Sequence, residues 1–145
     1  AARLGLPNIR TELQDASVCR EEWKDSADVV LCDVPCSGLG IIRKKPEIRF
    51  KNPDEIQTLP EIQARILANC AQYVKKGGTL VYSTCTILQR ENEDVVRAFL
   101  TENPEFEAVS WTHPVCGERA DGMVTLLPPV HDTDGFFIAK MHRKV

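Results

Sequence analysis

The sequence has no long hydrophobic run. No apolar stretch approaches the roughly 20 residues that a helix needs to span a bilayer, and residues 1–7 contain no apolar segment of signal-peptide length. These absences argue against membrane insertion and predict a cytoplasmic protein. Internal repeats, low-complexity segments and a domain linker are also lacking, so the 145 residues are expected to form one domain.

The six cysteines include no CxxC pair. This absence argues against a zinc site and against a redox motif, and we expect no bound metal. Several of the cysteines lie in apolar, strand-like runs, and no secretion signal is present. Reduced thiols are therefore predicted in place of a disulfide framework.

The sequence also lacks an excess of positive charge. Its 18 Lys and Arg against 21 Asp and Glu give a net charge of −3, whereas a nucleic-acid-binding protein usually carries a basic excess. Any such role must therefore depend on local clusters, which lie at 43–51 and 140–144. A solvated surface is the simpler interpretation of both clusters in isolation.

The alternation of apolar runs with amphipathic segments predicts an α/β fold with a largely parallel sheet. Strands are expected at 9–13, 29–33, 79–82, 106–111 and 136–141. A short helix is expected to start at 52–55, followed by one at 61–74 and another that begins near Glu91. Residues 112–133 are predicted to be a long irregular loop. The uninterrupted apolar run at 29–32 is typical of a central strand that is buried on both faces.

Two polar turns follow predicted strands, and each contains a cysteine. Cys36 lies just after the strand at 29–33, and Cys85 lies at the end of the next strand. Ligands of open α/β sheets bind beyond the carboxyl ends of strands. We therefore expect the two thiols to approach one another at that edge, with Asp33 within reach. A lone cysteine is more often a buried apolar filler, which suits Cys32 and Cys70.

These turns carry a resemblance to a known family. Asp-Val-Pro-Cys-Ser-Gly at 33–38 resembles motif IV of the RNA cytosine-C5 methyltransferases of the Sun/RsmB type, and Ser-Thr-Cys-Thr at 83–86 resembles their motif VI. The basic stretch at 43–50 and Asp-Gly-Phe-Phe at 134–137 resemble two further motifs, in the family's order.

The resemblance implies a fold. The expected structure is a truncated Rossmann-like sheet of an S-adenosylmethionine-dependent methyltransferase, mainly parallel with an antiparallel C-terminal strand, that lacks the first two strands. Residues 1–145 would be the C-terminal part of the catalytic domain. The family's glycine-rich loop, which would cradle the cofactor, has no counterpart in this sequence.

The resemblance also implies roles for residues. Cys85 would be the nucleophile that adds to cytosine C6, Cys36 would act in its release, and Asp33 would hydrogen-bond the base. The residues alone leave the two thiols interchangeable, because DNA cytosine-C5 methyltransferases use a Pro-Cys cysteine as nucleophile. The implied contacts of S-adenosylmethionine are Asp15, Asp33 and Pro35. The implied contacts of RNA phosphates are Lys44, Lys45 and Arg49.

The expected function is therefore methyl transfer from S-adenosylmethionine to C5 of cytosine in RNA, with 16S ribosomal RNA as the expected partner. The alternative is a non-catalytic RNA-binding fragment that cannot hold the cofactor, and cofactor titration separates the two. A thiol oxidoreductase is less favoured, since the CxxC motif is absent. The strand at 29–33 is expected to be an open edge that either self-associates or is covered by residues 1–14.

Overall fold

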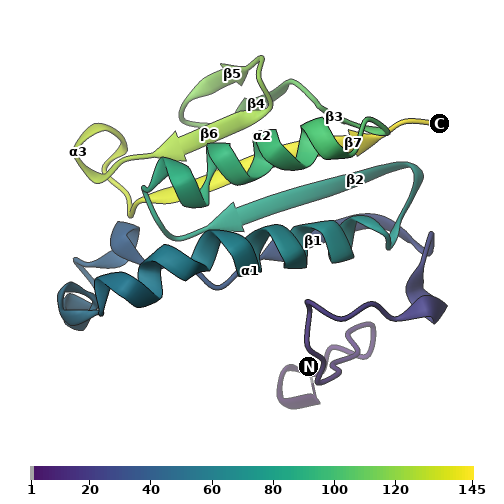
Figure 1. Cartoon of the computed structure of the whole chain (residues 1–145), viewed down its shortest axis with the longest axis horizontal. Coiled ribbons are helices and arrows are strands. Elements are labelled where there is room, and N and C mark those ends of the chain that lie inside the picture. Colours follow the sequence, from purple (N-terminus) through teal and green to yellow (C-terminus); the bar gives the residue numbers. More distant parts are fainter. Residues whose placement is uncertain (1) are drawn as a thin grey trace.

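The computed structural model describes residues 2–145, which are built on a five-stranded mixed sheet (Figure 1). β1 (Ala27–Asp33) pairs parallel with β2 (Val74–Thr84), and β2 pairs antiparallel with β7 (Phe136–Arg143). β3 (Phe106–Ala108) and β6 (Met123–Leu126) both pair antiparallel with β7. The expected α/β sheet with an antiparallel C-terminal strand is present, and parallel pairing within the described residues is confined to β1 and β2.

Two helices pack in front of this sheet in the view of Figure 1. α1 (Pro53–Ala71) lies along β1 and β2, and α2 (Glu93–Glu102) lies along the antiparallel part. The core between them and the sheet includes fully buried Leu67, Leu80, Tyr82, Val96 and Phe137. Among residues 2–145, no helix combines the length and apolar character needed to cross a membrane.

Short elements complete the chain. The 3₁₀ helices are η1 (Ala2–Leu4), η2 (Glu21–Trp23), η3 (Leu39–Ile41), η4 (Pro46–Phe50) and η5 (Gln89–Glu91). The remaining pieces are β4 (Trp111–His113), β5 (Gly117–Arg119) and α3 (Pro128–His131). β4 and β5 pair with each other in a separate two-stranded sheet.

The two helices expected at 52–55 and 61–74 form one continuous helix, α1, so the expected break between them is wrong. Asn52 caps it by accepting a hydrogen bond from the Asp54 amide at 3.0 Å, as its sequence predicted. Pro60 lies inside the helix. Proline in a helix interior costs about 3 kcal/mol, and burial of Ile66 and Leu67 against the sheet offsets this cost.

Gly77 and Gly78 lie inside β2. The register between β1 and β2 shifts here, since Ala27 pairs with Val74 and Val29 already pairs with Thr79. Gly77 has φ of 76°, and a Cβ on Gly78 would lie 2.8 Å from the Lys75 carbonyl oxygen. The pair therefore forms an irregularity inside the strand, where only glycine fits.

Two further expectations are corrected. Residues 9–13 form no strand, because no neighbouring segment of the described chain hydrogen-bonds to them as a strand. Residues 112–133 are not one irregular loop, since they contain the β4–β5 hairpin, β6 and α3. Burial of Met123 and Val124 beside β7 stabilises β6. Because this pairing joins segments that are distant in sequence, residues 123–126 by themselves give little indication of a strand. The expected strand at 106–111 is divided between β3 and β4.

β1 lies at an edge of the sheet, as the open-edge expectation for 29–33 stated, and is not a central strand buried on both faces. Val29 and Leu31 are 64% and 67% exposed. Among residues 2–145, no backbone hydrogen bond joins the segment before residue 15 to β1. An apolar strand with unpaired backbone groups is a template for another chain.

We predict that the isolated chain self-associates through β1. Light scattering should give twice the monomer mass of 16.3 kDa. Leu31→Lys should shift the chain toward monomer, because a charge on an edge strand opposes pairing. Val130→Lys, at an equally exposed apolar residue of α3, is the control. A wild-type monomer whose amides at 29–32 exchange freely with solvent would contradict this prediction.

Candidate active site

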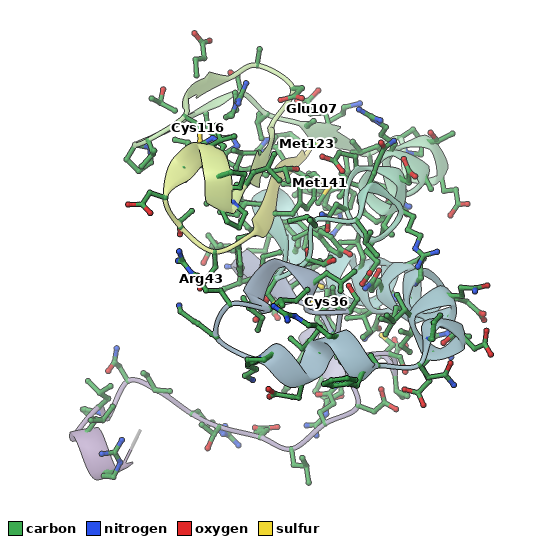
Figure 2. The ribbon with its side chains drawn as sticks, turned by 90° about the vertical axis from the view of Figure 1, so that its left-hand side faces the viewer. Cys36, Arg43, Glu107, Cys116, Met123 and Met141 are labelled. Atoms are coloured by element: carbon green, nitrogen blue, oxygen red, sulfur yellow. The ribbon has the colours of Figure 1, made fainter. Side chains whose placement is uncertain are left out.

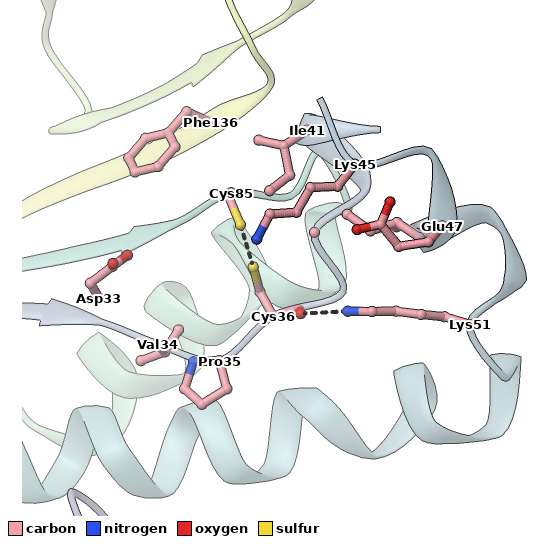
Figure 3. Close-up of a pocket in the computed structure, with 12 residues that line it drawn as sticks. Asp33, Val34, Pro35, Cys36, Ile41, Lys45, Glu47, Lys51, Cys85 and Phe136 are labelled. Carbon is pink, nitrogen blue, oxygen red and sulfur yellow. Dashed lines mark hydrogen bonds between the residues drawn. The ribbon is translucent and has the colours of Figure 1, made fainter. Parts of the chain in front are cut away.

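A cavity of about 510 Å³ lies at the carboxyl edge of β1 and β2 (Figure 3). Asp33 pairs with Ser83 in the parallel ladder, so the turns after the two strands leave the sheet side by side. The cavity is lined by both turns, by η4 and by Phe136 at the start of β7. Three parts of the chain that are distant in sequence, 33–51, Cys85 and Phe136, therefore border one space.

Two free thiols meet in this cavity. Cys36 Sγ and Cys85 Sγ lie 3.2 Å apart, and both residues are half-buried. The expected approach of the two cysteines is confirmed. Burial, followed by the hydrogen bond with Cys85, raises the pKa of Cys36 to about 12. Cys36 is therefore a neutral thiol at neutral pH and can donate its S–H to the Cys85 sulfur.

Asp33 borders the same space at the end of β1. The Ser83 hydroxyl donates a hydrogen bond to Asp33 Oδ1 at 2.9 Å, which fixes the carboxylate while the residue stays exposed. Pro35 also lines the cavity, and its carbonyl accepts a hydrogen bond from Gln63 Nε2 at 2.9 Å. A charged acceptor and two thiols thus face one ligand-sized volume.

Backbone contacts join the two cysteine turns to the start of β7. The Gly40 amide donates to the Cys85 carbonyl at 3.0 Å, and the Gly135 amide donates to the Gly40 carbonyl at 2.8 Å. A Cβ on Gly40 would lie 2.1 Å from the Gly135 carbonyl oxygen. Residue 40 must therefore be glycine for these three segments to approach.

Behind the cavity lies a buried polar network that the sequence analysis missed. Its fully buried members are Ser37, Gln63, Thr84, Thr86, Glu91 and Asn92. Ser37 Oγ and Thr86 Oγ1, which follow the two cysteines, lie 2.7 Å apart. Glu91, which the sequence assigned to a favourable helix terminus, instead turns inward from η5. The run of hydroxyl residues beside both cysteines was the available signal, since buried hydroxyls require partners.

The predicted RNA-contacting residues divide into three environments. Lys45 lines the cavity, and Figure 3 shows its side chain directed toward the two thiols. Lys44 forms an ion pair with Asp134, which also lies 3.6 Å from Arg43 Nη2. Arg49 is exposed on η4 outside the cavity lining. Figure 2 shows Arg43 and Cys36 on the same side of the molecule.

Lys51 is a cation at this site that sequence reasoning did not assign to it. Its ammonium donates to the Ser37 carbonyl at 2.8 Å and reaches the Cys36 carbonyl at 3.5 Å. Lys51 therefore stabilises the turn that carries Cys36.

Asp15 lies apart from the cavity lining. Its carboxylate accepts hydrogen bonds from the Ser17 amide and hydroxyl at 2.9 and 2.7 Å, which lower the pKa of Asp15. This is the geometry of an aspartate that stabilises its own turn.

The cavity fits one end of a sulfonium methyl donor. Asp33 and Pro35 border the space next to the thiols, and this space can admit a methyl group and a planar base together. A glycine-rich turn that would cradle the donor's methionine is not found at this edge in residues 2–145. The described residues therefore provide for the reacting end of the donor and not for all of it.

Comparison with known proteins shows the family of the chain. Residues 1–142 match the family described as 16S rRNA methyltransferase RsmB/F. The chain is 44% identical to the probable ribosomal RNA small subunit methyltransferase B of Bacillus subtilis (strain 168), over 99% of this chain and 34% of that protein. The chain thus spans about a third of the length of this curated relative.

Solved structures show the same fold. The crystal structure of PH0851 superposes with a TM-score of 0.90 at 35% identity and covers 98% of this chain and 32% of that one. NSun6 from Pyrococcus horikoshii with SFG has a TM-score of 0.77 at 25% identity, over 98% of this chain and 36% of that one. The truncated Rossmann-like methyltransferase fold predicted from the sequence is confirmed.

The thiol pair predicts a pH-dependent difference in reactivity. Cys85 should be alkylated by iodoacetamide faster than Cys36 at neutral pH, because only a thiolate reacts and Cys36 stays protonated up to about pH 12. Burial still raises the pKa of Cys36 in Cys85→Ala, but the hydrogen bond that adds to it is removed, so Cys36 should react at somewhat lower pH than in wild type. Peptide mass mapping over a pH series measures both rates. An unchanged Cys36 profile in Cys85→Ala would contradict this account.

Proposed function

The chain belongs to the 16S rRNA methyltransferase RsmB/F family, and we propose that it carries the reacting groups for methylation of C5 of a cytosine in 16S ribosomal RNA. The observation that carries the proposal is the pair of free thiols 3.2 Å apart beside Asp33 in one cavity. S-adenosylmethionine, the methyl donor that we propose for this site, supplies an electrophilic methyl group when bound.

The proposed first step makes the base reactive. Cytosine C5 is a poor nucleophile, because the aromatic ring resists attack on a methyl group. The Cys85 thiolate adds to C6, and the electron pair of the C5=C6 bond is displaced into the ring toward C5 and N3. The Asp33 carboxyl would accept a hydrogen bond from the N4 amino group and share a proton with N3, and this proton offsets the negative charge that develops at N3. C5 then forms a bond to the methyl group as the donor's S–CH3 bond breaks.

The proposed release step uses Cys36. After methyl transfer, C5 holds its original proton and the new methyl group. Removal of that proton returns its electron pair to the C5=C6 bond, and the C6–S bond breaks to regenerate the Cys85 thiolate. Burial still raises the pKa of Cys36 while Cys85 is held in the adduct, but the hydrogen bond with Cys85, which adds to that effect, is absent. Cys36, after its own S–H proton passes to solvent, would be the base that takes the C5 proton.

Cations around the cavity suit a phosphate backbone in this proposal. Lys45 lines the cavity beside the thiols, and Lys44 is 69% exposed although it pairs with Asp134. Arg49 lies on η4, which forms one wall of the same cavity. These side chains would position the RNA without reading its sequence. Asp33 and Pro35 would contact the donor from the cavity. The expected contact from Asp15 is not part of this proposal, because its carboxylate accepts hydrogen bonds from Ser17 apart from the cavity lining.

Substitution of the cysteines in the full-length enzyme tests the assigned roles. Cys85→Ala should reduce methylation by about 10³-fold or more, because no adduct can form. Cys36→Ala should still form the adduct but release it slowly, so that a covalent enzyme–RNA species accumulates on denaturing gels. Cys116→Ala, at a thiol of the β4–β5 connection, is the control. Accumulation in Cys85→Ala instead would reverse the two roles.

Removal of one cation tests the RNA contact. Lys45→Ala in the same enzyme should weaken RNA binding similarly for all sequences and lower the slope of log K against log salt by about 1. Lys76→Ala is the matched control, since this exposed lysine lies near the opposite end of β2. Filter binding across a salt series measures the slopes. Equal slopes for the two variants would show that Lys45 contacts no phosphate.

A further inference from the structure

We propose that Glu91 is a positioning residue that holds the Cys36 thiol against Cys85, and that it shares this task with Asn92. Glu91 does not line the cavity and is fully buried behind it. The effect of Glu91 on catalysis rests on the proposed function, whereas its effect on the distance between the two thiols does not.

Glu91 secures the residues on both sides of Cys36. Its Oε2 accepts a hydrogen bond from the Ser37 amide at 2.9 Å and another from Gln63 Nε2 at 2.9 Å. The same Gln63 nitrogen donates to the Pro35 carbonyl at 2.9 Å. The backbone just before and just after Cys36 is therefore attached to one buried carboxylate–amide pair.

Asn92 secures the residues on both sides of Cys85. Thr84 Oγ1 donates to Asn92 Oδ1 at 2.6 Å, and Asn92 Nδ2 donates to the Thr86 carbonyl at 3.1 Å. Both contacts are buried. Two consecutive residues thus hold the two cysteine turns, each through the flanking residues and neither through a sulfur atom.

The segment that carries Glu91 is itself anchored to the sheet. The Tyr82 hydroxyl, fully buried in β2, donates to the Glu91 carbonyl at 2.7 Å. The Glu91 amide donates to the Leu88 carbonyl at 3.0 Å in η5. The carboxylate therefore extends from a fixed backbone, and the turn at 35–37 adjusts to it.

Burial of a carboxylate favours positioning over stability. A buried charge costs free energy that a well-packed apolar side chain would not cost. Glu91 Oε1 is buried without a hydrogen-bond partner among residues 2–145, which adds to this cost. Low polarity around the carboxylate also strengthens its hydrogen bonds, so the turn at 35–37 is held in one arrangement.

Bridging of the thiols by dibromobimane, which becomes fluorescent when it joins two neighbouring thiols, tests the proposal on this chain. Glu91→Leu removes both acceptor contacts and should slow the Cys36–Cys85 bridge about tenfold. Glu91→Gln keeps an acceptor for the Ser37 amide and should lie within about threefold of wild type. Asp94→Asn, an exposed carboxylate of α2, is the matched control and should match wild type. Peptide mapping identifies the bridge, and thermal melting confirms folding.

The same variants in the full-length enzyme test catalysis. Glu91→Leu should lower kcat about tenfold, leave KM for RNA within about twofold and accumulate the covalent adduct as Cys36→Ala does. Glu91→Gln should restore kcat toward wild type, because it keeps a hydrogen-bond acceptor at residue 91. A merely structural defect would not depend on whether residue 91 can accept a hydrogen bond. If no variant, Cys36→Ala included, forms an adduct while bridging still falls, the proposed function fails and the positioning role stands.

Wild-type bridging in a folded Glu91→Leu chain would overturn the proposal. If that variant does not fold, Gln63→Leu provides the same test, because it removes the attachment of the Pro35 carbonyl. Its bridging rate should also fall about tenfold, and an unchanged rate would overturn the proposal equally.

Discussion

The site depends on the parallel pairing of β1 and β2. Parallel strands end at the same edge of a sheet, and the pair Asp33–Ser83 is the last rung of this ladder. A turn follows each strand within a few residues. Cys36 and Cys85, which are 49 residues apart in sequence, therefore lie next to each other. An antiparallel pair would have sent the two turns to opposite edges, and the thiols could not have met.

Parallel pairing brings the turns near each other, but it does not set the distance between two sulfur atoms. That distance is set by contacts made after the strands end. The Gly40 and Gly135 backbones approach too closely for any side chain, and buried hydrogen bonds connect Ser37, Thr86 and the 91–92 pair behind the cavity. Such networks are costly when incomplete, so they favour a single arrangement of the groups that they join.

The two sides of β1 differ in their pairing and exposure. Toward β2 the strand is paired and partly covered by α1, and its end forms the cavity. Away from β2, its backbone groups are unpaired, and Val29 and Leu31 are exposed. The chain spans about a third of its B. subtilis relative. Asp33 and the exposed Val29 and Leu31 therefore belong to the same strand, so a partner that covered this edge would lie next to the cavity.

Sequence alone determined the α/β class, the positions of β1, α2 and β7, and the two cysteine turns, because these features depend on local apolar periodicity and short motifs. Tertiary structure decided the rest. The continuity of α1 through Pro60 and the pairing of β6 with β7 depend on contacts between distant segments. Glu91 is the clearest case: the sequence presents an acidic residue near a helix start, and only packing against Ser37 and Gln63 turns it into a buried acceptor. A sequence pattern records which side chains are polar, but their partners are chosen by the fold.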